Sequence, residues 1–185
     1  KRHVADSYRR IRGTDDPDSI LSLNNLAMNY HRQGKIAEST SALEEVLAAQ
    51  RRVGSGETAE SQMTAVNLAS AYKVQGRFDE ALALLESAYA DAERIWGPEP
   101  TQTLITANNY ADLLMNRGEL ARAEPILLHV LEVRRRVNGP HHERTLGVLS
   151  NVGTLYRNKG EDAAAGPYFR EAAEGAVETL GPSHR

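Results

Sequence analysis

Residues 103–116 read TLITANNYADLLMN, and Gly118 follows shortly after. Apolar side chains recur in this stretch at intervals of four and three residues, at Ala107, Ala111 and Leu114. That spacing places them on one face of an amphipathic helix. Because glycine readily adopts the left-handed backbone that ends many helices, we expect the helix to stop just before Gly118.

The same arrangement returns along the whole chain at a fixed interval of 42 residues. The glycines in this register are Gly34, Gly76, Gly118 and Gly160. Asparagines repeat with the same interval, at Asn25, Asn67, Asn109 and Asn151. A constant period of this size indicates a repeat architecture in which each unit is one small supersecondary element.

Each repeat is predicted to be a helix, a turn at the glycine and a second helix. Gly97-Pro98, Gly139-Pro140 and Gly181-Pro182 are predicted to end second helices, since proline cannot continue a helix. The predicted first helices cover 18–32, 60–74, 101–116 and 143–158, and the predicted second helices cover 36–53, 78–96, 120–137 and 162–180.

The repeat boundaries follow from this map. We expect one domain over 1–185, with 1–13 as the last helix of a partial repeat and complete repeats at 14–56, 57–98, 99–140 and 141–182. Asp16-Pro17 is expected to supply an N-cap and a first-turn proline. The first repeat has Gly54 and Gly56 in place of Gly-Pro, which predicts the most mobile junction at 54–58.

The repeated residues resemble those of the tetratricopeptide repeat. The resemblance rests on Leu26-Ala27-x-x-Tyr30, on Leu68-Ala69-x-x-Tyr72 and on the pairing of Ala123 with Leu127. That repeat has a period of about 34 residues. The longer period here, together with Asn108-Asn109-Tyr110-Ala111 and Gly139-Pro140-His141-His142, resembles the kinesin-light-chain type. The resemblance implies an all-α fold, a right-handed α-solenoid of helix-turn-helix repeats, and a protein-interaction module rather than an enzyme.

A second, more polar stripe runs along each predicted first helix, and the resemblance implies that it lines a concave groove. An asparagine amide can donate and accept, so it can bind the backbone of an extended peptide. Packed helices lie about 8–10 Å apart and an extended peptide advances about 3.3 Å per residue. One asparagine would then meet roughly every third peptide residue. The candidate peptide-binding residues are Asn24, Asn25, Asn67, Lys73, Asn108, Asn109, Asp112, Asn151 and Arg157.

Two alternatives stay open for this stripe. The repeated asparagine could hold a ligand, or it could hydrogen-bond the next repeat and hold the solenoid together. Lys73 and Arg157 add a mild positive bias that would suit an acidic peptide, whereas Asp112 argues against a uniformly basic groove.

Composition and motifs exclude several other classes of function. The formal net charge of −3 and the lack of a long apolar run give no indication of nucleic-acid or membrane binding. The chain has no cysteine, which fits a cytoplasmic protein. No catalytic or cofactor motif is present. His141-His142 is expected to form a turn or cap rather than a metal site, and Arg134-Arg135-Arg136 is expected to face solvent at a helix end.

Two further roles are predicted as alternatives to peptide binding. The chain could assemble with itself through an uncovered face of the last helix, which carries Ala164, Tyr168, Ala172 and Val177. It could also be the sensor arm of a larger multidomain signalling protein, an inference that rests on fold analogy alone.

Overall fold

The computed structural model describes residues 13–54 and 56–180, and within them every regular element is a helix. All eight predicted helices are confirmed, with ends that differ from the prediction by at most one residue. The predicted helix at 1–12 and the Gly181-Pro182 stop lie outside the described residues. The helices are α2 (Pro17–Arg32), α3 (Ile36–Arg52), α4 (Ala59–Val74), α5 (Phe78–Trp96), α6 (Thr101–Asn116), α7 (Leu120–Asn138), α8 (Glu143–Asn158) and α9 (Asp162–Leu180).

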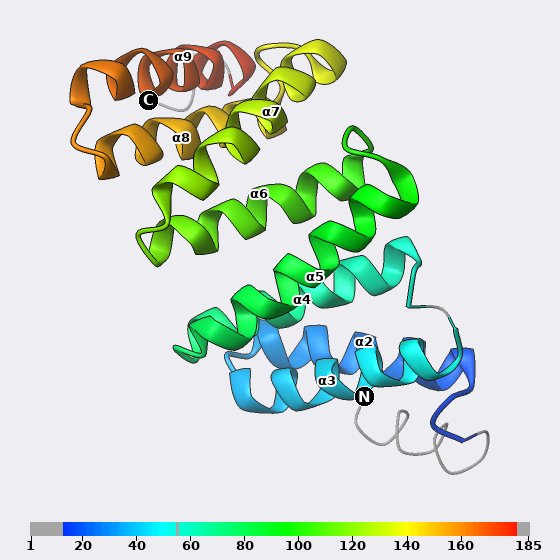
Figure 1. Cartoon of the computed structure of the whole chain (residues 1–185). Coiled ribbons are helices and arrows are strands. Elements are labelled where there is room, and N and C mark those ends of the chain that lie inside the picture. Colours follow the sequence, from blue (N-terminus) through cyan, green and yellow to red (C-terminus); the bar gives the residue numbers. More distant parts are fainter. Residues whose placement is uncertain (1–12, 55, 181–185) are drawn as a thin grey trace. The chain divides into compact units, whose positions relative to one another are not determined.

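Consecutive helices pair into hairpins, and the hairpins belong to two compact units (Figure 1). The first unit ends at Gly97 and contains the hairpins α2–α3 and α4–α5. The second begins at Pro98 and contains α6–α7 and α8–α9. Within each unit the second helix of one hairpin packs against the first helix of the next, as α3 does against α4 and α7 against α8. The prediction of a single domain over 1–185 stays a prediction.

At the starts of α2, α4 and α8, a capping side chain accepts a hydrogen bond from a backbone N–H that has no partner within the helix. The Asp16 carboxylate accepts hydrogen bonds from the backbone of Asp18 and Ser19, and Pro17 follows as the first helical residue. The predicted cap and first-turn proline of α2 are therefore confirmed. His142 caps α8 by accepting a bond at Nδ1 from the backbone N–H of Arg144, which confirms the capping prediction for this histidine.

The turn glycines end the first helices as predicted. Gly34 has φ +71°, a left-handed conformation that suits glycine. The next residue, Lys35, donates its N–H to the carbonyl of Tyr30 at 3.0 Å, which satisfies a carbonyl left over in the last helical turn. The same pair of features recurs at Gly76, Gly118 and Gly160.

The core of each hairpin depends on a small residue opposite a large one. In the first three hairpins a fully buried alanine on the first helix is matched by a buried leucine on the second. At the repeat positions that correspond to Gly153 and Phe169, these residues are Ala27 and Leu43, Ala69 and Leu85, and Ala111 and Leu127. The last hairpin has Gly153 and Phe169 instead, and a Cβ on Gly153 would lie 2.8 Å from the Phe169 ring. The larger ring therefore occupies the space that the missing methyl group leaves.

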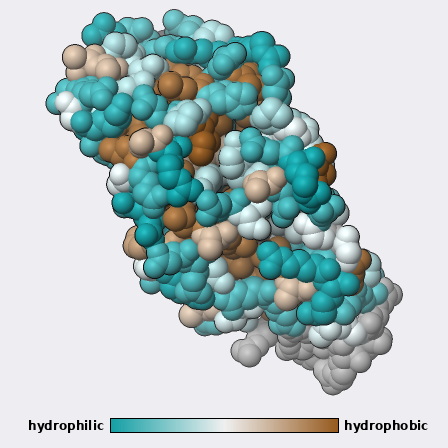
Figure 2. All heavy atoms as spheres, viewed as in Figure 1, coloured by the Kyte–Doolittle hydropathy of each residue, from teal (hydrophilic) through white to brown (hydrophobic). Residues whose placement is uncertain are grey.

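Polar contacts between side chains, three of them ion pairs, close the hairpins at their open ends, and the sequence did not predict them. In three hairpins an acidic residue before the first helix meets an arginine near the end of the second, as Asp15 meets Arg52 at 2.5 Å. The equivalent pairs are Glu57–Arg94 and Glu99–Arg136, and in the last hairpin His141 Nδ1 lies 2.6 Å from the Glu178 carboxylate instead. All are solvent-exposed, so each stabilises the fold only slightly. Figure 2 shows that hydrophilic side chains cover most of the visible face, with hydrophobic ones in separate patches.

Candidate peptide-binding site

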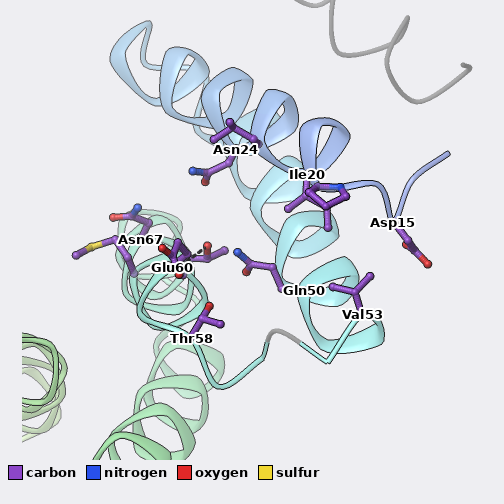
Figure 3. Close-up of a pocket in the computed structure, with 12 residues that line it drawn as sticks. Asp15, Ile20, Asn24, Gln50, Val53, Thr58, Glu60 and Asn67 are labelled. Carbon is purple, nitrogen blue, oxygen red and sulfur yellow. Dashed lines mark hydrogen bonds between the residues drawn. The ribbon is translucent and has the colours of Figure 1, made fainter. Parts of the chain in front are cut away.

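Each unit contains a cavity at the place where its two hairpins meet. The first cavity lies between α2, the end of α3 and the start of α4 (Figure 3) and has a volume of about 590 Å³. The second lies between α6, α7 and α8 and has a volume of about 370 Å³. Most lining residues of the two cavities correspond to each other at an interval of 84 residues, which is two repeats. The cavities are therefore equivalent sites on the repeated scaffold.

Apolar side chains form much of the wall of the first cavity. They include Ile20 and Leu21 on α2, Val53 just after α3 and Met63 on α4. Leu21 is 58% exposed and Val53 is 46% exposed, although both are large and apolar. Neighbouring apolar side chains that remain accessible at a cavity are typical of binding surfaces.

Two predicted asparagines face the first cavity from opposite helices. Asn24 lies on α2 and Asn67 on α4, and Figure 3 shows both amides in the space between these helices. Asn67 donates through Nδ2 to the sulfur of Met28 at 3.6 Å. The Oδ1 atom of Asn24 is buried and accepts no hydrogen bond from the described part of the chain. A buried acceptor of this kind is uncommon and costly.

The equivalent asparagines of the second cavity are bonded to each other. Asn151 donates through Nδ2 to Oδ1 of Asn108 at 2.9 Å. Asn109, which also lines this cavity, donates to the carbonyl of Ile105 at 2.8 Å within its own helix. The bond between Asn151 on α8 and Asn108 on α6 supports a structural role for the asparagines of the second unit. In the first unit, by contrast, the acceptor of Asn24 has no donor from the described residues.

The second cavity also contains two arginines. Arg134 is only 3% exposed, so the prediction that it faces solvent is wrong; its neighbours Arg135 and Arg136 are exposed. Its guanidinium donates to Oδ1 of Asn138 at 3.2 Å and to the carbonyl of Thr101 at 3.4 Å. Burial lowers the pKa of Arg134, and the nearby positive charge of Arg144 lowers this pKa further. Arg144 itself is exposed and lines the same cavity.

The remaining predicted site residues lie outside both cavities. Asn25 is exposed, and Lys73 and Asp112 are half-buried. The backbone carbonyl of Asp112 accepts a hydrogen bond from the side chain of Asn116 at 2.7 Å. Arg157 is exposed and lies over the ring of Phe169, with 5.4 Å between the guanidinium carbon and the ring centroid.

Sequence reasoning missed Arg134, although the repeat interval held a signal for it. Position 134 corresponds to Gln50, which is also buried and lines the first cavity. It also follows buried Val130 by four residues and so shares its helix face. The burial of Arg134 is not evident from the run of three arginines, because Arg135 and Arg136 do face solvent.

The last helix is partly covered by its own hairpin. Tyr168 stacks on Tyr156 with ring centroids 5.5 Å apart, and Ala172 is buried. Val177 is 53% exposed. Self-association through this helix stays a prediction.

Other kinds of site have no candidate in the described part of the chain. Among these residues, no three histidine or acidic side chains come together as metal ligands would. No described helix has both the length and the apolar character needed to cross a membrane.

The geometry above defines a class of protein: an all-α solenoid built from stacked helical hairpins. Two family profiles described as tetratricopeptide repeat match the chain, one over residues 102–178 and the other over 19–53 and 62–101. Together they cover most of the sequence. The chain therefore belongs to the tetratricopeptide-repeat family, whose repeats are generally protein-interaction modules.

Solved structures show which form of this repeat the fold resembles. A crystal structure of nearly identical TPR-like repeats, from a Podosopora anserina protein of kinesin-light-chain type, has a TM-score of 0.84 at 22% identity; the match covers 97% of this chain and 84% of that one. BtubC (BKLC) from P. vanneervenii has a TM-score of 0.79 at 21% identity, with 90% and 66% covered. No curated protein matches the sequence. The fold is thus that of kinesin-light-chain-type repeats.

Proposed function

We propose that this protein is a non-enzymatic interaction module that holds an extended peptide segment of a partner protein along its first helices. The main support is Asn24, which lines the first cavity and whose buried Oδ1 has no donor from the described residues. A peptide N–H would supply that donor and remove the cost of the unsatisfied acceptor. The cytoplasmic location predicted from the composition belongs to the same proposal.

The shape and walls of the first cavity define the side chain that such a peptide would contribute. A volume of about 590 Å³ falls within the range of about 300–1,000 Å³ that is typical of ligand pockets. A large apolar side chain that enters the cavity would remove the exposed apolar surface of Leu21, Val53 and Met63 from water. The peptide backbone would then lie against Asn24, with its apolar side chain between these residues.

The asparagines of the second unit have a different role in this proposal. Asn108 and Asn151 bond to each other, so they hold α6 and α8 together. Backbone recognition by a free asparagine oxygen is thus assigned to the first unit.

A random library of capped 12-residue peptides, selected on the full chain, tests the proposal. The dissociation constant of a selected peptide is measured for the wild type, for Asn24→Ala and for Asn29→Ala. Asn29 is a matched control because it has the same side chain on the same helix but does not line the cavity. We expect Asn24→Ala to weaken binding about tenfold, as for the loss of one good hydrogen bond.

Nuclear magnetic resonance locates the bound peptide independently. The side-chain amide signals of Asn24 and Asn67 should shift as a selected peptide is added, while that of Asn29 should not. Equal affinity of the two alanine variants, with no shift at Asn24, would contradict the proposal.

A further inference from the structure

We propose that the cavity of the second unit binds a carboxylate side chain of the partner peptide, and that positions 134 and 144 determine this preference. The equivalent cavity of the first unit takes an uncharged side chain instead. This inference rests on the proposed function, since it names the chemistry of the residues that the peptide presents.

Within the described part of the chain, Arg134 lies in surroundings that supply no negative charge. Its guanidinium is almost completely buried, and its two hydrogen-bond acceptors, on Asn138 and Thr101, are both neutral. Within residues 13–54 and 56–180, no carboxylate oxygen forms an ion pair with it. A buried charge without a counter-charge is costly. An anion in the cavity would provide the missing partner.

Arg144 brings a second positive charge to this cavity. It lines the same cavity from the start of α8, and its charge acts unfavourably on Arg134. One carboxylate between them would relieve this repulsion and accept hydrogen bonds from either guanidinium. Bonds of this charge-assisted type are stronger than bonds between neutral groups. The asparagines nearby are neutral, so the two arginines are the charged donors of this cavity.

The two equivalent cavities differ in charge at these two positions. Gln50 stands where the second unit has Arg134, and Glu60 stands where it has Arg144. The first cavity therefore offers a neutral amide and a negative charge at the positions where the second offers two positive charges. Glu60 would repel a carboxylate, while the apolar walls beside it favour an uncharged side chain.

A small probe tests the anion site directly. Propionate has the shape of a glutamate side chain, and propionamide is its uncharged counterpart. We expect propionate to shift the Nε–Hε signal of Arg134 in a saturable manner, and propionamide to leave it unchanged. Arg144→Glu, a change at an exposed position, should abolish the shift without affecting the fold. Equal effects of both probes, or a shift that survives Arg144→Glu, would overturn the inference.

Exchange of the two positions tests the specificity with residues that the chain already uses. Gln50→Arg with Glu60→Arg gives the first cavity the charges of the second, and Arg134→Gln with Arg144→Glu does the reverse. A selected peptide that contains glutamate is compared with its glutamine analogue. We expect the wild type to prefer glutamate about tenfold, and Arg134→Gln with Arg144→Glu to remove that preference. Circular dichroism verifies that each variant is folded.

The outcomes separate this inference from the proposed function. If glutamate and glutamine peptides bind equally and propionate does not shift Arg134, peptide binding stands and the carboxylate site is refuted. If propionate binds at Arg134 but no selected peptide contacts Asn24, the carboxylate site stands and the peptide function is refuted. After Gln50→Arg with Glu60→Arg, a new propionate shift at position 50 is expected, and its absence would contradict the assignment of these two positions.

Discussion

The first cavity is large and apolar with an unsatisfied asparagine oxygen, whereas the second is smaller and cationic with its asparagines bonded to each other. Both lie at the same place on a scaffold that repeats every 42 residues. The turn glycines and the small residues of the core are retained between the units, so they fix the backbone. Several side chains that line the cavities differ between the units, such as Gln50 against Arg134. Two sites built on one backbone can therefore differ in the chemistry that they recognise.

The core of the last hairpin departs most from the shared pattern, and it gives the largest expected effect. Gly153→Ala would place a methyl group 2.8 Å from the ring of Phe169. We expect the free energy of unfolding to fall by about 1–3 kcal/mol, as for overpacking of a core. Chemical denaturation followed by circular dichroism measures this.

A second substitution tests whether the pair is the cause. Phe169→Leu added to Gly153→Ala recreates the alanine–leucine pair of the other three hairpins, and should recover most of the lost stability. Gly147→Ala, in the same helix as Gly153, is the control, because no neighbouring atom lies within 4 Å of its Cβ position. That change should stabilise the helix by about 0.5–1 kcal/mol. Failure of Phe169→Leu to rescue would show that the two positions are not coupled.

The asparagine pairs predict a smaller effect, a difference between the units in the free energy of unfolding that is lost on substitution. Asn151→Ala removes the side-chain donor that bonds Oδ1 of Asn108, and should cost about 1–2 kcal/mol. Asn67→Ala removes only a weak contact with the sulfur of Met28 at 3.6 Å, and should cost less than about 1 kcal/mol. Equal losses in thermal or urea denaturation would mean that the two pairs contribute alike.

Tyr72 and its equivalent Tyr156 predict the smallest effect, which appears only in alkali. Burial raises the pKa of Tyr72 to about 12, and a hydrogen bond to Glu44 adds to the shift. The unfolded chain ionises this phenol near pH 10, while the folded protein retains the proton. The associated stability is therefore present below pH 10 and is lost as the pH rises to about 12.

Tyr72→Phe should reduce this loss of stability between pH 10 and pH 12. The measurement is the change in urea midpoint between pH 8 and pH 11, for the variant and the wild type. Burial also raises the pKa of Tyr156, so Tyr156→Phe should act in the same direction. A pH dependence identical to that of the wild type in both variants would contradict the expected ionisation.

The scaffold could be predicted from the sequence because its determinants are local. A glycine with positive φ, a capping aspartate and an apolar face each depend on residues within a few positions of one another. The cavities could not be predicted, since they depend on how side chains from three helices meet. Asn67 contacts Met28 rather than Asn24, and Arg134 is buried beside two exposed arginines. The 84-residue interval alone pairs Arg134 with Gln50, but only the packed structure shows that both side chains are buried.

Each cavity belongs to a junction, since its walls come from one hairpin and from the first helix of the next. Recombination that moves a whole hairpin would keep every turn and core contact inside it, yet would give it a new neighbour across the junction. New pockets could therefore arise by shuffling intact modules, before any point mutation. Genes for such proteins could diversify their ligands by unequal crossing-over in units of 42 codons, with the fold preserved at each step.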